Sequence, residues 1–210
     1  MRNAPPQQYS VNSGRPQVYK SSLYDFQSYA QAGQSSLTFF AIPIGQSGKT
    51  KADTNLTLAG QLPKPQSFVC ESLEVYFYPG NTIDTVATTA TNAAGNADDV
   101  YNFLKSGSLE MSLLGQVRIL EAPLGRFPPS CAMRLETTSA GTFTAPNQSR
   151  TSYATGVGVR YAIEPRMTVF AGEAFSVVMN WPSLVPMSVA ARIGVVIGGK
   201  LWLNAPAGAN

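Results

Sequence analysis

The sequence predicts an all-β sandwich, and three observations lead to this class. The chain has 210 residues, a length that suits one large β domain. Segments in which apolar and polar residues alternate recur along it, with Gly- and Pro-rich turns between them. No segment has the length and periodicity of an ordinary amphipathic helix, and only residues 98–105 could form one or two helical turns.

We expect residues 1–36 to form an extended N-terminal arm. They are rich in Gln, Ser, Pro and Tyr, they lack helical and strand periodicity, and they cannot bury enough apolar surface to fold alone. A solvated tail would not need their aromatic residues, so the arm should lie on a neighbouring subunit or on its own sandwich. The candidate contact residues are Tyr9, Tyr19, Tyr24, Phe26 and Tyr29. Deleting residues 1–30 should then leave the domain folded.

The sandwich itself is expected over residues 37–205, with a short C-terminal tail at 206–210. Residues 67–78 form the clearest strand: Val69, Leu73, Val75 and Phe77 fall on one face, and Glu71 interrupts the pattern. The other expected strands cover residues 37–42, 55–59, 100–104, 109–113, 117–121, 156–164, 175–181, 192–198 and 201–203. Residues 82–99 and 137–154 are expected to be long loops of small residues. About eight strands joined by long loops favour a jelly-roll sandwich, and the Cys–Trp–Cys spacing of an immunoglobulin domain is missing.

Charge is scarce and unevenly placed. Charged residues make up 13% of the chain, against about a quarter in typical domains. Either partners cover much of the surface, or the surface is a neutral one of Ser, Thr, Asn and Gln. The formal net charge of +3 equals the charge of residues 1–20, which contain Arg2, Arg15 and Lys20 and no acid. These three are candidates for weak contact with packaged nucleic acid; the alternative is a solvated tail whose charges are incidental.

The chain has no histidine, which removes the usual general base and the commonest metal ligand. Glu71 and Glu74 share a strand, but their odd spacing should point them to opposite faces, so they could not flank one glycosidic bond. The Asp98-Asp99 pair is typical of a helix start or a turn. We therefore expect no enzyme, no cofactor and no metal site.

Three further features bear on partners and location. Cys70 and Cys131 could form a disulfide, although two free thiols are favoured. No run of about 18 apolar residues predicts a transmembrane segment, and no signal peptide is visible. Trp181 ends a strand and could serve as a sugar-binding platform, but its place in the Phe175–Val177–Met179 series favours the core.

Four segments resemble structural proteins encoded by bacteriophages and prophages. They are residues 55–68 (NLTLAGQLPKPQSF), 109–129 (LEMSLLGQVRILEAPLGRFPP), 175–182 (FSVVMNWP) and 192–200 (RIGVVIGGK). The resemblance implies a single jelly-roll virion protein, assembled in the host cytoplasm, whose partners are copies of itself and other virion proteins. The expected function is a capsid protein that self-assembles into an icosahedral shell. The alternatives are a cement or decoration protein, or a carbohydrate-binding module of a phage tail or fibre. The family supplies no functional residue to transfer.

Overall fold

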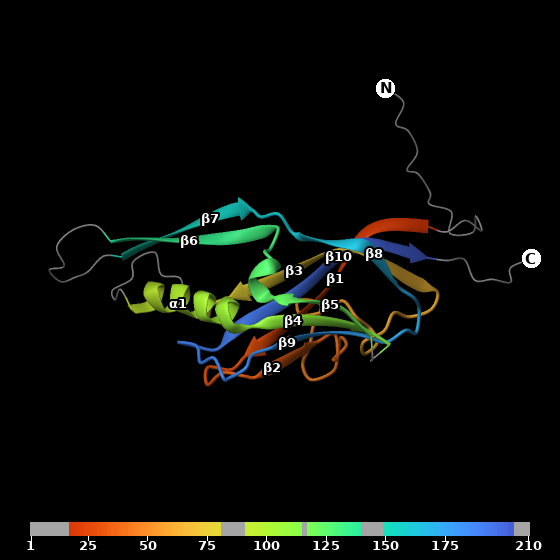
Figure 1. The fold of residues 1–210 in the computed structure, drawn as a ribbon, viewed down its shortest axis with the longest axis horizontal. Coiled ribbons are helices and arrows are strands. Elements are labelled where there is room, and N and C mark those ends of the chain that lie inside the picture. Colours follow the sequence, from red (N-terminus) through yellow and green to blue (C-terminus); the bar gives the residue numbers. More distant parts are fainter. Residues whose placement is uncertain (1–16, 81–90, 115–116, 140–148, 204–210) are drawn as a thin grey trace, which may run out of the picture.

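A computed structural model describes residues 17–80, 91–114, 117–139 and 149–203 (Figure 1). Two antiparallel four-stranded sheets form the body. Sheet A has the order β1 (Gln17–Tyr29), β10 (Ala191–Leu203), β3 (Gln66–Tyr78) and β8 (Tyr161–Val169). Sheet B has the order β2 (Ser36–Phe39), β9 (Phe175–Asn180), β4 (Ser108–Leu113) and β5 (Val117–Pro123). The other elements are α1 (Thr91–Ser106), the 3-10 turn η1 (Leu124–Arg126) and a two-stranded sheet of β6 (Cys131–Ser139) and β7 (Ser149–Val157).

The eight body strands pair in a nested order. The first pairs with the last (β1 with β10), the second with the next to last (β2 with β9), then β3 with β8, and β4 with β5. Two further antiparallel contacts, β10 with β3 and β4 with β9, complete the two sheets. The β6–β7 hairpin is an insertion between β5 and β8, and its strands pair with each other. The all-β sandwich expected from the sequence is therefore confirmed.

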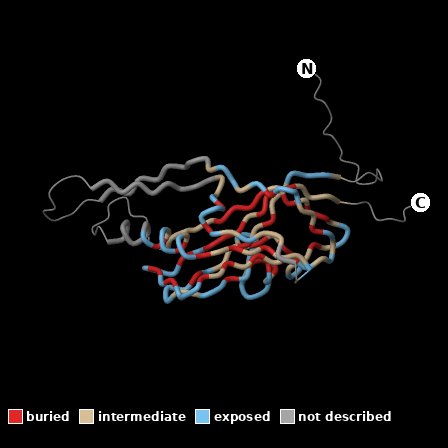
Figure 2. Tube along the Cα trace, in the orientation of Figure 1, coloured by how far each residue is buried: buried red, intermediate tan, exposed pale blue. Residues whose placement is uncertain are grey.

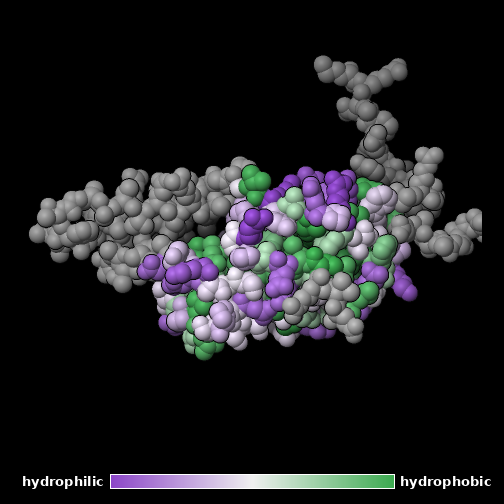
Figure 3. Space-filling model, in the orientation of Figure 1, coloured by the Kyte–Doolittle hydropathy of each residue, from purple (hydrophilic) through white to green (hydrophobic). Residues whose placement is uncertain are grey.

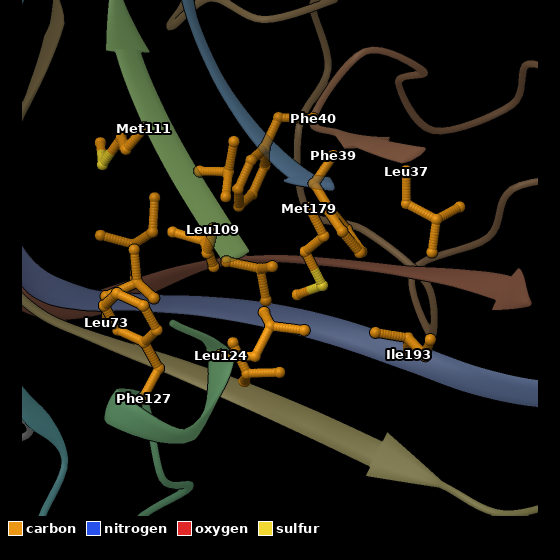
Figure 4. Close-up of a cluster of buried hydrophobic side chains, with 14 of the residues drawn as sticks. Leu37, Phe39, Phe40, Leu73, Leu109, Met111, Leu124, Phe127, Met179 and Ile193 are labelled. Carbon is orange, nitrogen blue, oxygen red and sulfur yellow. The ribbon is translucent and has the colours of Figure 1, made fainter. Parts of the chain in front are cut away.

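The core fills the space between the two sheets (Figure 2). Alternating residues of the central strands point inward, as the period-2 pattern requires. Leu109, Met111 and Met179 of sheet B face Leu73 and Ile193 of sheet A (Figure 4). Leu124 and Phe127, from the PLGRFPP segment, close the same cluster and are also buried. That segment therefore packs into the core through these two side chains.

Strand β3 confirms the predicted position but corrects the predicted faces. The register of β3 shifts between Cys70 and Ser72 against β8 and against β10, so Glu71 is an extra, bulged residue. Before the bulge the buried side chains are Phe68 and Cys70, and after it they are Leu73 and Val75. Val69, predicted to be on the buried face, is only half-buried because the bulge reverses the alternation.

Residues 17–29 lie on the chain's own sandwich, which is one of the two places expected for the arm. They form β1, which pairs with β10 along all 13 residues. Leu23, Asp25 and Tyr29 are buried within the same chain, so the arm lies on its own sandwich as an edge strand. Deleting residues 1–30 would remove this strand, which corrects both the domain boundary at residue 36 and the expected outcome of that deletion. Residues 1–16 lie outside the described residues.

Two long loops were predicted where the structure has regular elements. Helix α1 begins at Thr91, inside the expected loop 82–99, and is far longer than the one or two turns expected. It also includes residues 100–104, so the strand expected there is wrong. Strands β6 and β7 occupy both ends of the expected loop 137–154. Residues 55–59 contain no strand and take part only in an isolated bridge between Leu58 and Gln61. Within the described part of the chain, no helix is long and apolar enough to cross a membrane.

Helix α1 closes one end of the sandwich. Phe103 is fully buried and packs on Trp181 and Phe77, with ring centroids 5.2 and 4.9 Å apart. The Asp99 carboxylate accepts hydrogen bonds from the backbone N–H and the hydroxyl of Ser188. Asp99 is therefore a buried docking residue in mid-helix, which corrects its assignment to a helix start or a turn.

Candidate functional site

The outer face of sheet A is hollowed. A pocket of about 620 Å³ opens there between β1, β3, β8 and β10. Its floor contains the buried side chains of Ser72 and Glu74. Lys20, Glu71 and Arg160 stand among the residues around it. Hydrophilic side chains cover the upper margin of Figure 3, where β1, β8 and β10 come together in Figure 1.

Two glycines of β10 create the hollow. A Cβ atom on Gly198 would lie 2.5 Å from the Ser72 hydroxyl, and one on Gly199 would lie 1.9 Å from the Val69 carbonyl oxygen. Both distances are far shorter than a carbon atom tolerates, so only glycine lets β3 and β10 approach at the bulge. The small residues of the segment RIGVVIGGK therefore set the depth of the pocket.

The two glutamates of β3 share this pocket, which corrects the expectation that they point to opposite faces. The bulge at Glu71 adds one residue and cancels the effect of their odd spacing. The Glu74 carboxylate accepts hydrogen bonds from the Tyr76 hydroxyl (2.9 Å) and the Ser130 backbone N–H (2.7 Å). One Glu71 oxygen lies 3.1 Å from an Arg166 guanidinium nitrogen and 3.5 Å from the Lys200 ammonium. The pair supplies oxygen acceptors for N–H and O–H groups of a ligand.

A cluster of aromatic rings continues from the pocket along the same face. We call it the aromatic row: Tyr24 and Phe26 of β1 with Tyr76 and Tyr78 of β3. Phe26 is central, with ring centroids 6.0 to 6.3 Å from the other three. Its ring crosses β10 above Gly194, where a Cβ atom would lie 2.1 Å from the ring. The Arg192 guanidinium stands 4.7 Å from the same ring centroid.

Beyond the aromatic row a second hollow of about 390 Å³ is lined by Phe26, Tyr78 and Arg192. Arg192 also bonds to the Asp53 carboxylate at 2.9 Å. The pKa of Asp53 is held below its ordinary value, first by the backbone N–H and the hydroxyl of Thr50, and in smaller part by Arg192. The ionised Asp53 thus fixes the Arg192 side chain beside the row.

The outer face of sheet B differs in chemistry. Glu110 of β4 and Glu121 of β5 are directly opposite each other in the register. The other described side chains of β2, β4 and β9 that alternate with the core residues are Ser36, Thr38, Ser108, Ser112, Ser176, Val178 and Asn180. This face is therefore neutral to acidic in its described side chains, whereas the outer face of sheet A carries several cations.

One end of the sandwich exposes large apolar side chains. We call it the apolar loop end, made of Tyr19, Leu58, Leu114 and Phe170, whose exposed fractions are 44%, 44%, 59% and 56%. Leu114 follows β4 and donates its N–H to Ala174, and Gly172 donates to Leu62, so these loops are tied together. Tyr19 lies in the same row of sheet A as Val169, the last residue of β8. Apolar side chains reach the surface near this end in Figure 3.

The residues predicted as sites fall in different places. Lys20 is exposed at the pocket, whereas Arg2, Arg15 and Tyr9 lie outside the described residues. Tyr29 is completely buried and donates its hydroxyl hydrogen to the Val185 carbonyl at 2.8 Å, so it is not a subunit contact. Tyr24 and Phe26 belong to the aromatic row, and Tyr19 to the apolar loop end.

Trp181 is not a sugar platform. Its side chain is buried, and its indole N–H donates to the Phe103 carbonyl oxygen at 3.2 Å. The core position favoured by the sequence pattern is therefore the correct one. This finding removes the observation on which a carbohydrate-binding module was based.

Cys70 is a free thiol buried in the core, and desolvation raises its pKa to about 12. A thiol with so high a pKa is unreactive at neutral pH. The free state of Cys70 agrees with the prediction, and the side chain of Cys131 lies outside the described residues. Among the described residues, no three metal-ligating side chains come together.

Neither a family model, nor a curated protein, nor a solved structure matches this chain. The likeness of four of its segments to bacteriophage structural proteins therefore gains no support from these comparisons.

Proposed function

We propose that this chain is a virion structural protein with a jelly-roll fold, which assembles with copies of itself and carries out no catalysis. The nested order of strand pairing is the observation that supports this most. Pairing of eight strands first with last, second with next to last, and so on inward is the pattern expected of a jelly roll, in which two Greek keys make up two sheets. Viral capsid domains, lectins and cupins use this arrangement.

The packed interior favours a shell protein among those three. Larger β-barrels enclose ligand cavities, whereas here the space between the sheets is occupied by fully buried side chains such as Phe39, Phe68 and Leu109. Trp181, the sugar-binding candidate from the sequence, is part of the same packed core. A solid sandwich suits a protein that serves as a rigid tile.

The apolar loop end supports assembly with further copies. Its four side chains form an exposed apolar surface of the kind that marks protein contacts. The opposite end exposes a different set, Tyr101, Leu184 and Val189. Contacts between unlike ends of identical subunits are heterologous, and such contacts build rings and lattices. The low charge of the chain agrees with a surface that partners cover.

Assembly can be tested with purified protein by sedimentation velocity and negative-stain electron microscopy. We expect rings, shells or lattice fragments from the unmodified protein. The double variant Leu114→Asp, Phe170→Asp should sediment as a monomer, because it places charges on the apolar loop end. Val159→Asp is the matched control, since Val159 is 87% exposed and lies outside that end.

Three results would count against the proposal. They are an unmodified protein that stays monomeric at all concentrations and is absent from virions by mass spectrometry, a double variant that assembles normally, or a control that fails equally. Binding only to preformed particles would identify a decoration protein instead of the shell protein.

A further inference from the structure

We propose that the outer face of sheet A binds single-stranded nucleic acid, with the pocket and the aromatic row forming one continuous track. The inference rests on the proposed function for its biological setting. It states which face of the subunit would contact a packaged genome. The proposed surface consists of four strands. It replaces the three basic residues predicted to contact nucleic acid, Arg2, Arg15 and Lys20, of which only Lys20 is among the described residues.

Four cations, Lys20, Arg160, Arg166 and Lys200, surround the carboxylates of Glu71 and Glu74 on this face. Lys20 of β1 and Lys200 of β10 are directly opposite each other, an arrangement of like charges that destabilises a sheet. Glu71 is shared between Lys200 and Arg166. Among the described residues, neither Lys20 nor Arg160 has a carboxylate within salt-bridge distance. Lys20 and Arg160 are therefore available to phosphates, which would also compete with Glu71 for Lys200 and Arg166.

The aromatic row provides rings on which bases can stack. Single strands bind sequence-tolerantly where a basic groove runs beside rings on which bases stack. Tyr24, Phe26, Tyr76 and Tyr78 are all half-buried, so their ring atoms reach the surface while the sheet holds them in place. From Lys20 to Ser28 the track follows eight residue steps of β1, roughly 26 Å at the rise of an extended strand. That length accommodates several nucleotides.

The pocket floor carries carboxylate oxygens. Carboxylates accept hydrogen bonds from the exocyclic amino groups of bases, and Glu71 and Glu74 supply such oxygens beneath the cationic rim. Phosphates would meet Lys20 and Arg160 at the rim, while a base would reach the floor.

The test is fluorescence anisotropy with a labelled mixed-sequence DNA strand of about 20 nucleotides, longer than the ~4–16 nucleotides that one small β-barrel domain covers. Neutralising about four phosphates predicts a slope of log affinity against log salt near −2.8, which means about fifty-fold weaker binding at 200 than at 50 mM salt. Lys20→Gln with Lys200→Gln should halve this slope. Tyr78→Leu should weaken binding about five-fold or more and leave the slope unchanged, because it removes stacking and no charge.

The control is Lys105→Gln, which removes one positive charge from α1, away from the proposed track, and should leave affinity and slope unaltered. Circular dichroism of every variant checks that the fold is retained. The proposal is overturned if the unmodified protein does not bind the strand, if the control weakens binding as much as the β-sheet variants, or if a glycan array gives hits that Tyr78→Leu abolishes while DNA does not bind. Particles that assemble without binding DNA would refute this inference and leave the proposed function intact, and binding without assembly would do the reverse.

Discussion

The buried ion pair between Asp25 and Lys49 provides the sharpest test of how the sandwich is held together. Asp25 is fully buried on β1, and its carboxylate pairs with the Lys49 ammonium from the loop that follows β2. The same carboxylate accepts the backbone N–H of Phe40 at 2.7 Å. Phe40 has a positive φ of 67° and a buried ring, so Asp25 fixes a turn that a phenylalanine rarely adopts.

Asp25→Ala should lower the free energy of unfolding by about 3–5 kcal/mol. Removing one member of a buried pair leaves the other charge stranded, and the side chain of Lys49 is only 10% exposed. The Phe40 N–H also loses its acceptor, which alone costs about 1–3 kcal/mol where no water replaces it. Together these effects change the folding equilibrium constant by about two to four powers of ten.

Urea unfolding followed by tryptophan fluorescence measures this loss, because Trp181 is buried in the core. The matched control is Arg166→Ala, which breaks an exposed pair with Glu71 and should cost no more than about 1 kcal/mol. Asp25→Asn with Lys49→Met should recover most of the stability, since no charge is then stranded and an amide oxygen can still accept the Phe40 N–H. If Asp25→Ala costs no more than the control, the buried pair does not hold β1 to the loop and the reasoning fails.

Three other perturbations test the fold. Deleting residues 1–16 should leave cooperative unfolding intact, whereas deleting residues 1–30 removes β1 and should abolish it; equal behaviour of the two truncations in a thermal melt would contradict the assignment of β1 to the core sheet. Cys70 keeps its proton up to about pH 12 when folded and releases it near pH 9.0 when unfolded. Its contribution to stability is therefore complete below pH 9 and lost above it, at up to about 1.4 kcal/mol per pH unit, and Cys70→Ala should flatten that slope in urea titrations. Trp181→Ala should cost about 3–5 kcal/mol, because it opens a cavity beside Tyr29 and Phe103; a cost below about 1 kcal/mol would show that the ring is not enclosed.

Strands with a clean alternation of apolar and polar residues could be predicted from the sequence. The inward series of β9 and β10 was recognised because every buried residue in it is apolar. Strand β1 was missed because two of its inward positions carry Asp25 and Gln27, so its alternation does not appear in hydrophobicity. Burial of Asp25 depends on Lys49, a partner that only the folded chain brings close. Helix α1 was missed for a related reason: its first half consists of small residues without a periodic apolar stripe.

The candidate site depended on register, which no local pattern reveals. In the sequence, Glu71 interrupts the apolar alternation of residues 67–78. The sequence alone does not distinguish a charged residue on the buried face from an extra residue in a β-bulge. The bulge puts Glu71 and Glu74 on the same side of sheet A, where both line the pocket. The aromatic row likewise needs β1 and β3 on either side of β10, an adjacency between strands that lie far apart along the chain.

The nested pairing also sets the order of events during synthesis. Strand β10 lies between β1 and β3, so before residues 191–203 leave the ribosome β1 has no neighbour in sheet A. At about 5–20 residues per second, the first strand waits roughly ten seconds or longer for its partner. During that interval its edge is open to other chains, and a nascent chain with this topology depends on rapid release or on a chaperone to avoid premature association.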